Sequence, residues 1–342
     1  MTSTRTDVEI RTLRPGDRQA VLRLLTDTMG GGPTGVRTAR FFAWKHERNP
    51  FGASLALIAE ADGRIVGLRC FMRWRFVRHG HVVSAVRAVD TATHPQYQRQ
   101  GIFSRLTRAA LGMAADAGID VVFNTPNAKS LPGNLKMGWA RVGLVPIAVR
   151  VARPRAFGRG LRHRHSASGP PTPLPPVELP PASAALGDVA SVQQLLDAAR
   201  QPHDRFRTDR SAEYLRWRYA VAPGLDYRAI ADHNGGRLHG IAIGRPRWRG
   251  RLVEFTLSEV IVRDGDRATA RKLLSAVARS GVDHVATHLT GWPTAEAARR
   301  RAGYVTAPRQ AMTLVARPFD PSMAVDTSLD DWALSLGDLE VF

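Results

Sequence analysis

One short stretch of the chain combines the residue types that can hold a diphosphate. It reads Gln98-Arg99-Gln100-Gly101-Ile102-Phe103-Ser104, between an apolar segment and an amphipathic one. A polar turn between a strand and a helix leaves backbone N–H groups unpaired at the helix N-terminus, where the helix dipole adds partial positive charge. Gly101 lets the backbone approach a phosphate closely, and Arg99 can balance its charge. The pattern predicts an anion site, although an ordinary strand-to-helix turn has the same form.

The elements around this turn are predicted from the periodicity of apolar residues. Period-two alternation and apolar runs indicate strands, and apolar residues three and four apart indicate helices. We expect a mixed sheet with helices on both faces, in the order helix, helix, strand, strand, strand, helix, strand, helix, strand. The predicted helices cover 15–28, 36–47, 102–117 and 127–137, and the predicted strands cover 54–60, 64–77, 81–93, 120–124 and 139–151.

Two parts of the chain repeat this order. Residues 41–46, an aromatic and basic stretch, have a counterpart in residues 214–219, and in both parts an Asx-Gly hairpin turn follows. Gly138-Trp139 opens the last predicted strand of the first part, and Gly303-Tyr304 opens that of the second. We interpret the agreement as a tandem duplication.

A proline-rich segment separates the two copies. It carries seven prolines within residues 170–181 together with basic residues, a composition typical of a stiff, exposed spacer that forms no packed element. The predicted organisation is a first domain over 1–152, a linker over 153–184, a second domain over 185–320 and a C-terminal tail over 321–342.

The first copy resembles the GNAT acetyltransferase superfamily. Gln98, Gly101 and Phe103 stand at the three defined positions of its diphosphate loop, Gln/Arg-x-x-Gly-x-Gly/Ala, with Phe103 departing from the usual small residue. Asn127 resembles the asparagine that follows the fifth strand, and Gly138-Trp139 resembles the Gly-Phe that opens the next. The resemblance implies an α/β fold of two tandem GNAT-like domains, each a mixed, mostly antiparallel sheet flanked by helices.

The resemblance also implies an activity and a cofactor site. We expect an acyl-CoA-dependent N-acyltransferase that uses acetyl-CoA as co-substrate and needs no metal. Backbone N–H groups near Ala92 and Thr93 are expected to polarise the thioester carbonyl. The residues expected to bind the cofactor are Ala92, Thr93, Gln98, Arg99, Gln100, Gly101, Ile102, Phe103, Ser104 and Asn127.

The second copy replaces this loop with an acidic one. Asp264 and Asp266 stand where a diphosphate would lie, and like charge opposes binding of a diphosphate. We therefore predict one acyl-CoA site, in the first copy, and a second copy that shapes the acceptor pocket.

The groups that would move protons are less evident. Asn134 stands where the superfamily often has a tyrosine that protonates the leaving thiolate, and an amide cannot act as an acid. Tyr97 is the nearest alternative in sequence. Candidate bases are Asp90 and His94, whose ordinary roles would be a salt bridge and a turn cap.

Two further regions could also supply a base. His46 and Glu47 end a helix that lines acceptor sites in the superfamily. In related tandem aminoglycoside acetyltransferases a terminal carboxylate reaches the active site. Here the apolar tail offers Asp338, Glu340 or the Phe342 carboxylate.

Composition narrows the remaining choices. No apolar run is long enough to span a membrane, the N-terminus lacks the order of a signal peptide, and Cys70 is the one cysteine. We expect a cytoplasmic protein with no membrane partner. The net charge of +19 attracts anions, but the arginines are scattered, so a nucleic-acid partner is not expected.

The predicted acceptor is a small-molecule amine, such as an amino sugar or an amino acid derivative. Two alternatives stay open: an aminoacyl-tRNA-dependent transferase on the same scaffold, and a non-catalytic module that binds anions or nucleic acid.

Overall fold

The computed structural model describes residues 7–30, 37–162, 173–320 and 328–339. The predicted element order of the first copy is confirmed from residue 18 onward, with ends shifted by a few residues, and the structure adds a short first strand, β1, that was not predicted. In chain order its elements are β1 (Glu9–Thr12), α1 (Arg18–Met29), α2 (Ala39–His46), β2 (Leu55–Ala61), β3 (Arg64–Arg78), β4 (His81–Thr93), α3 (Ile102–Asp116), β5 (Val121–Asn124), α4 (Leu131–Lys136) and β6 (Ala140–Val151).

The rest of the chain repeats this order with additions at both ends. Its elements are α5 (Pro154–Arg162), α6 (Ala182–Ala185), α7 (Val189–Ala198), β7 (Phe206–Thr208), α8 (Ala212–Leu215), a π-helical turn (Arg216–Ala220), β8 (Arg228–Asn234), β9 (Arg237–Arg249), β10 (Leu252–Val262), α9 (Arg267–Ala278), β11 (His284–Thr287), α10 (Pro293–Arg301), β12 (Val305–Pro318), β13 (Trp332–Ala333) and α11 (Leu336–Leu339).

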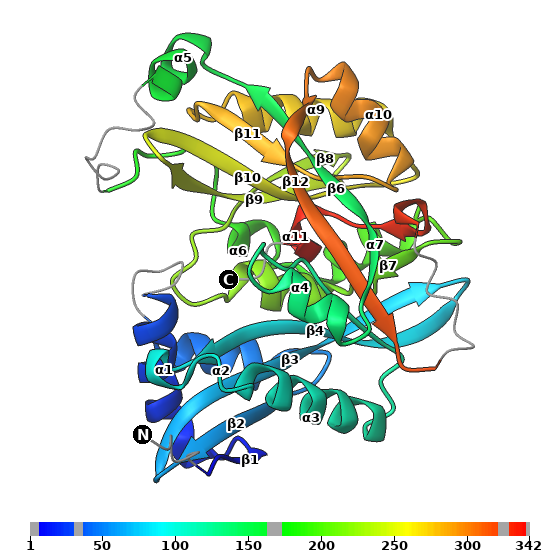
Figure 1. The fold of residues 1–342 in the computed structure, drawn as a ribbon. Helices are drawn as coiled ribbons and strands as arrows, with labels where there is room; N and C mark the ends of the chain where they lie inside the picture. The colour runs from blue at the N-terminus through cyan, green and yellow to red at the C-terminus, as the bar shows by residue number, and fades with distance from the viewer. Residues whose placement is uncertain (1–6, 31–36, 163–172, 321–327, 340–342) are drawn as a thin grey trace.

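Both copies contribute to one continuous mixed sheet, with strand order β1-β2-β3-β4-β5-β12-β6-β11-β10-β9-β8 (Figure 1). The long last strand of each copy is exchanged. β12 of the second copy pairs antiparallel with β5, and β6 of the first copy pairs antiparallel with β11. β6 and β12 also pair with each other, so each copy completes the sheet of the other.

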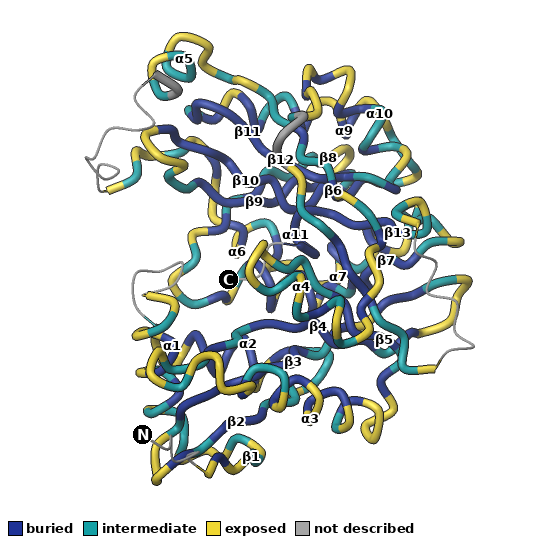
Figure 2. The backbone as a smooth tube through the Cα atoms, in the orientation of Figure 1, coloured by how far each residue is buried: buried dark blue, intermediate teal, exposed yellow. Residues whose placement is uncertain are grey.

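The two faces of the first copy's sheet are covered by different helices. Strand residues alternate between faces, and Ile58 and Leu68 pack with Leu24 of α1 on one face. Leu57 and Ala59 pack on the other face with Leu106 of α3. The burial pattern in Figure 2 follows this arrangement, with buried residues along the central strands of both copies.

The duplicated aromatic helices meet where the two copies touch. The rings of Trp44 and Trp217 stack with centroids 5.0 Å apart. Each indole N–H donates to the backbone carbonyl of the other residue, at 2.9 Å from Trp44 and 3.0 Å from Trp217. This reciprocal contact between equivalent residues supports the duplication and joins the copies through one shared core.

The expectation that the segment 153–184 forms no packed element was wrong. Residues 154–162 form α5, and the ring of its Phe157 contacts the His284 ring with centroids 5.2 Å apart. Leu179 and Ala182, further along the segment, are buried. These apolar side chains pack against residues of the second copy. The proline content of the segment gave no sign of this distant packing. Among the described helices, none combines the length and hydrophobicity that a membrane-spanning helix needs.

Candidate functional site

The site is created by two neighbouring strands that separate. β4 and β5 pair in parallel only where Ala85 to Arg87 face Val121 to Phe123. Beyond that point the strands diverge, and a cavity of about 740 Å³ lies between residues 88–93 and 124–127. A volume of this size is in the range of sites that enclose small molecules and cofactors.

The N-terminus of α3 forms one wall of this cavity. Gly101 is the N-cap residue of this 15-residue helix, with a left-handed φ of 77°, and no side chain caps the first amides. Arg99 also has a positive φ, 62°. Uncapped backbone N–H groups at the positive end of the helix dipole are the donors that bind phosphate groups. This helix terminus therefore has the open donors that an anion needs, and the anion site itself stays a prediction.

Most of the expected site residues line this one cavity. The exceptions are Ala92, which is buried in the sheet, and His94 and Gln100, which are not part of the wall. Phe342 lies outside the described residues. The expected residues at the cavity wall are Asp90, Thr93, Gln98, Arg99, Gly101, Ile102, Phe103, Ser104, Asn127 and Asn134.

Asp90 sits at a bulge in β4. The register of β3 against β4 shifts at this point, leaving Asp90 as an extra residue with φ of 39°. Its carboxylate Oδ2 lies 2.8 Å from Lys45 Nζ and 2.8 Å from His46 Nε2. Although burial opposes ionisation, the Lys45 charge and the His46 hydrogen bond hold the pKa of Asp90 well below its ordinary value.

His46 is buried beside this carboxylate. Its Nε2 contacts Asp90 and its Nδ1 lies 2.9 Å from Ser54 Oγ. Burial lowers the pKa of His46, with Asp90 opposing this effect. The neutral ring therefore donates Nε2–H to Asp90 and accepts from Ser54, which fixes one tautomer.

His94 has a structural environment of its own. Its Nδ1 accepts a hydrogen bond of 3.4 Å from the Gln96 backbone, and its ring contacts Tyr97 edge-on with centroids 5.8 Å apart. This side chain caps the turn at Pro95–Tyr97 and faces a different surface cavity. Tyr97 lines the main cavity.

Asn127 organises the turn that leads into α4. Its side-chain Oδ1 accepts hydrogen bonds of 3.0 Å from the backbone N–H of both Lys129 and Ser130. The turn forms the wall of the cavity opposite the α3 loop and brings Lys129 to it.

Phe103 replaces the small residue of the family pattern, and α4 accommodates it. A Cβ added to Gly133 would lie 2.9 Å from the Phe103 ring, so this glycine makes room for the aromatic side chain. On its other side, the Phe103 ring centroid is 5.6 Å from the Arg69 guanidinium carbon.

Arg69 is a site residue that the sequence analysis did not identify. It lies on β3, is 3% exposed and lines the cavity. Its Nη1 donates to the Thr91 hydroxyl, whereas Nε and Nη2 have no partner among the described residues. Asn134 on α4 is also buried at the wall, and neither atom of its amide is hydrogen-bonded within the described part of the chain. For Arg69, the one signal in the sequence was an arginine inside an otherwise apolar strand pattern.

The second copy has closed the equivalent helix terminus. Asp266 is the N-cap of α9, and its Oδ1 accepts hydrogen bonds from the amides of Ala268 at 2.8 Å and Thr269 at 3.1 Å. The Thr269 hydroxyl also donates to Asp266 Oδ2, at 2.7 Å. This side-chain bond, followed by the amide bonds, lowers the pKa of Asp266. The carboxylate thus occupies the place that an anionic ligand would need.

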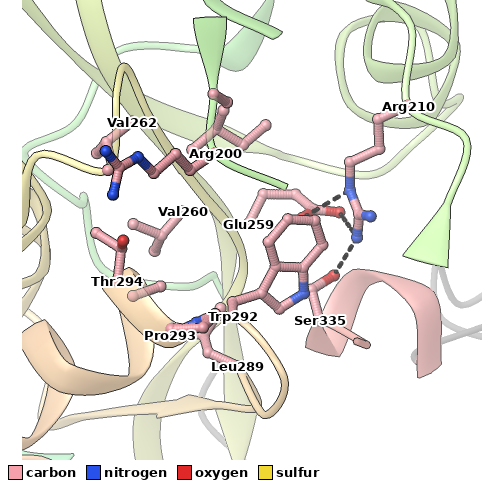
Figure 3. Close-up of a pocket in the computed structure, with 14 residues that line it drawn as sticks. Arg200, Arg210, Glu259, Val260, Val262, Leu289, Trp292, Pro293, Thr294 and Ser335 are labelled. Atoms are coloured by element: carbon pink, nitrogen blue, oxygen red, sulfur yellow. Dashed lines mark hydrogen bonds and ion pairs between the residues drawn. The ribbon is translucent and has the colours of Figure 1, made fainter. Parts of the chain in front are cut away.

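The cleft of the second copy is also filled. β10 and β11 pair over Glu254–Leu257 and His284–Thr287 and then separate, as β4 and β5 do. Only about 40 Å³ of space is left there, beside the Trp292 indole (Figure 3). The Arg210 guanidinium carbon lies 5.1 Å from the centroid of that ring.

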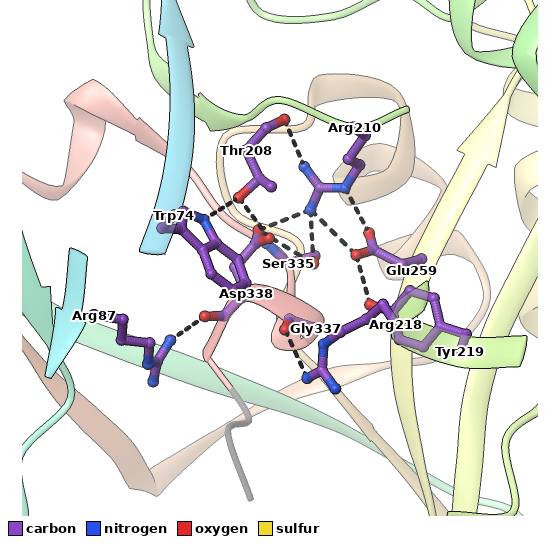
Figure 4. Close-up of polar contacts among 10 residues, drawn as sticks. All are labelled: Trp74, Arg87, Thr208, Arg210, Arg218, Tyr219, Glu259, Ser335, Gly337 and Asp338. Carbon is purple, nitrogen blue, oxygen red and sulfur yellow. Dashed lines mark hydrogen bonds and ion pairs between the residues drawn. The ribbon is translucent and has the colours of Figure 1, made fainter. Parts of the chain in front are cut away.

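The C-terminal segment enters the same cleft. The Leu336 amide donates to the carbonyl of His288, the residue after β11, at 2.9 Å, and α11 packs on β10. Asp338 is fully buried, and its Oδ2 lies 2.8 Å from Arg210 Nη2 (Figure 4). Arg210 Nε is in turn 3.2 Å from Glu259 Oε2. The chain itself therefore plugs the second cleft.

This segment also reaches the first copy. Arg87 of β4 donates to the backbone carbonyls of Asp338 and Leu339, the latter at 2.6 Å. The same guanidinium donates to the Thr125 hydroxyl at 2.9 Å, and Thr125 lines the large cavity. The Arg87 guanidinium thus links the Leu339 carbonyl to Thr125 of the cavity wall.

Comparisons with known proteins agree with this geometry. Residues 9–142 match the family model of the acetyltransferase (GNAT) domain. No curated protein matches the chain significantly.

Three solved structures share the fold. A GCN5-related N-acetyltransferase from Kribbella flavida is 14% identical with a TM-score of 0.60, over 94% of this chain and 73% of that one. One from Anabaena variabilis is 12% identical with a TM-score of 0.62, over 91% and 72%. A protein from Enterococcus faecalis, described as a probable N-acyltransferase, is 13% identical with a TM-score of 0.61, over 92% and 73%.

Proposed function

We propose that the chain, whose residues 9–142 match the acetyltransferase (GNAT) domain model, transfers an acetyl or other acyl group from acyl-CoA to the primary amine of a small molecule. The observation that carries the proposal is the cavity between β4 and β5, which ends at the uncapped N-terminus of α3. An amino sugar or an amino acid derivative is the acceptor class we favour, since the volume of the cavity, about 740 Å³, is in the range of small-molecule sites.

The cofactor's diphosphate binds at the start of α3. The backbone N–H groups of Gly101 to Ser104 donate to it, and Arg99 and Lys129 at the same wall balance its charge. The pantetheine arm then follows the unpaired edge of β4 past Thr93 and Ala92. The thioester carbonyl lies toward the bulge at Asp90, where backbone N–H groups outside the ladder can stabilise the developing negative charge.

Asp90 orients the reacting amine. A carboxylate whose pKa lies far below its ordinary value is a weak base, so proton removal by Asp90 itself is unfavourable. Asp90 and its partners Lys45 and His46 instead present a fixed pattern of charge and hydrogen bonds at the cavity wall. The amine proton leaves through water or through a group after Leu339.

Residues 340–342 are proposed to supply that group, with the Phe342 carboxylate as the first candidate. The support is the position of Leu339, whose carbonyl shares the Arg87 guanidinium with Thr125 of the cavity wall. Deleting only 340–342 leaves the buried Asp338 contacts in place, so turnover is expected to fall while acetyl-CoA affinity stays. Unchanged turnover in the shortened chain rejects this role.

We further propose that one acyl-CoA binds per chain, in the first copy. The Asp266 carboxylate satisfies the start of α9, and Trp292 and the C-terminal segment occupy the second cleft. Calorimetric titration with acetyl-CoA is expected to give a single site. Two equivalent sites would contradict the proposal.

The activity is tested by a panel of amines, read by release of free CoA thiol. Acetyl-CoA binding together with amine-dependent thiol release supports the acyltransferase. Aminoacyl-tRNA turnover without acetyl-CoA turnover would favour a transferase of that type. Salt-sensitive RNA binding without acetyl-CoA binding would favour a binding module.

A further inference from the structure

The cavity wall holds two buried polar side chains that nothing in the described part of the chain satisfies. Arg69 leaves Nε and Nη2 without a partner among the described residues, and Asn134 leaves both atoms of its amide. Arg69 is 3% exposed and Asn134 is 1% exposed, and both line the cavity. Buried polar groups are almost always hydrogen-bonded, so two such side chains at one wall point to a ligand that completes them.

The Arg69 guanidinium is held in a defined place. It lies between the rings of Phe71 and Phe103, with centroid distances of 5.1 and 5.6 Å, and it donates to the Thr91 hydroxyl. Although burial lowers the pKa of Arg69 to about 10, the side chain keeps its charge at neutral pH. A planar guanidinium can contact two aromatic rings and still donate several hydrogen bonds, so it fits this position better than an ammonium group.

This charge lacks a carboxylate counterion among the described residues. The nearest carboxylate of the wall, Asp90, is already paired with Lys45 and hydrogen-bonded by His46. Burying a cation without an anion is unfavourable unless an anion arrives with a ligand or forms in the reaction.

The place of Arg69 relative to β4 indicates which anion it would bind. Arg69 is paired with Thr91, one residue after the bulge, whereas the diphosphate has its own donors at the start of α3. In the proposed reaction the thioester lies at the bulge, where the carbonyl oxygen has the backbone N–H groups as donors, and the anion that still needs a donor there is the leaving thiolate. Asn134 lies on α4, where the resemblance places a tyrosine acid.

We propose that Arg69, with Asn134, binds the sulfur of CoA and stabilises the leaving thiolate as an anion, so that the reaction needs no proton donor at this atom. The inference rests on the proposed acyltransferase function. The amine nitrogen forms the new bond to the carbonyl carbon, the C–S bond breaks, and its electron pair stays on sulfur. The ammonium proton leaves to water or to the proposed group after Leu339, and the thiolate takes a proton from water after release.

The direct test is the pKa of the CoA thiol in the binary complex with the full chain. It is measured by titrating the ultraviolet absorbance of the thiolate. We expect the wild-type protein to lower this pKa by at least about one unit from the ordinary thiol value near 8.5, and Arg69→Met to remove the shift. Arg69→Lys, which keeps the charge, should retain part of it.

Turnover provides the second readout. Arg69→Met is expected to lower kcat by roughly 100-fold, the scale of losing one donor to a developing anion, with acetyl-CoA affinity within about threefold of wild type. Arg75→Met is the matched control, because Arg75 lies on the same strand but pairs with Asp209 at the exposed surface. It should change neither the thiol pKa nor kcat.

Several outcomes would overturn the inference. One is a bound-thiol pKa that is the same in wild type and Arg69→Met, in an enzyme that still acetylates amines. Another is a loss of turnover in Tyr97→Phe together with the loss of the alkaline limb of the pH profile, which would assign a proton donor. A third is a selective loss of dicarboxylic acyl-CoA turnover in Arg69→Met, which would make Arg69 a carboxylate site. If wild-type protein binds no CoA at all, the proposed function fails as well.

Discussion

Gly101 and Asp266 occupy the same position, the N-cap, of the equivalent helices α3 and α9. Gly101 has no side chain and leaves the first amides of α3 open to the cavity. Asp266 turns a carboxylate onto the amides of Ala268 and Thr269. The first amides of α3 are therefore open to an anionic ligand, whereas those of α9 are already bonded to the Asp266 carboxylate.

Replacing Gly101 with alanine is expected to weaken acetyl-CoA binding by about three- to tenfold. Gly101 has φ of 77°, which costs an L-residue on the order of 1 kcal/mol, and relief of that strain would turn the loop amides away from the diphosphate. Calorimetric titration measures the loss. Gly118→Ala is the matched control, because Gly118 has φ of 67° and ends the same helix far from the loop, so it should affect stability alone. Equal effects on affinity from both variants would contradict the assignment.

Removing the Asp266 cap is expected to cost stability without opening a second site. Asp266→Ala loses two amide bonds at the start of α9, worth about 1 kcal/mol. The cleft stays closed because Trp292 and α11 occupy it. Chemical denaturation and calorimetric stoichiometry should show a lower free energy of unfolding with one acetyl-CoA still bound. A second binding event in this variant would show that the carboxylate alone had blocked the site.

Breaking the buried pair of Asp338 and Arg210 is expected to be strongly destabilising. Asp338 is fully buried, so Asp338→Ala leaves the Arg210 charge with poorer compensation, at a cost of about 3–5 kcal/mol. The exposed pair of Asp226 and Arg228 supplies the control, since Asp226→Ala should cost less than about 1 kcal/mol. Urea unfolding of both variants measures the difference. A cost for Asp338→Ala as small as that of the control would argue against a structural role for the C-terminal segment.

Acid is expected to destabilise the protein partly through His288. Burial lowers the pKa of His288 to about 4 in the folded state, and its Nδ1 donates to the Pro146 carbonyl at 2.8 Å. The unfolded chain, with a pKa near 6.5, binds more protons between these values, so stability falls as the pH drops from 6.5 toward 4.

The size of this effect separates His288 from other groups. Between pH 7 and pH 5, His288→Asn should lose about 2 kcal/mol less stability than wild type, because asparagine can keep the bond to Pro146 but does not titrate. Urea unfolding at the two pH values measures this. The same loss in both proteins would show that other groups, such as buried His46, dominate the acid response.

Much of the first copy could be read from local patterns. The 3.6 and 2.0 periodicities of apolar residues gave the helices and strands from Arg18 to Val151, since each element buries one stripe or one face. The loop at Gln98 to Ser104 could be read as well, because an anion site at a helix terminus depends on neighbouring residues. The acidic cap Asp266 could be anticipated for the same reason.

What local patterns could not supply are contacts between distant residues. Arg69 and Asn134 are 65 positions apart in the chain and line one cavity only because β3, β4 and α4 converge there. The ring of Phe157 in α5 packs against His284, 127 positions away in the chain, and no pattern near Phe157 indicates this contact.

The sequence by itself indicated the duplication, the order of elements from residue 18 onward, the glycine-bearing loop before α3 and its replacement by an acidic one in the second copy. Only the tertiary structure decided that β6 and β12 are exchanged, that the C-terminal segment fills the second cleft, and that the buried Arg69 guanidinium lines the cavity of the first copy. The physical reason is range: propensity, capping and turn chemistry act over a few residues, whereas strand partners and buried charges are selected by the packing of the whole chain.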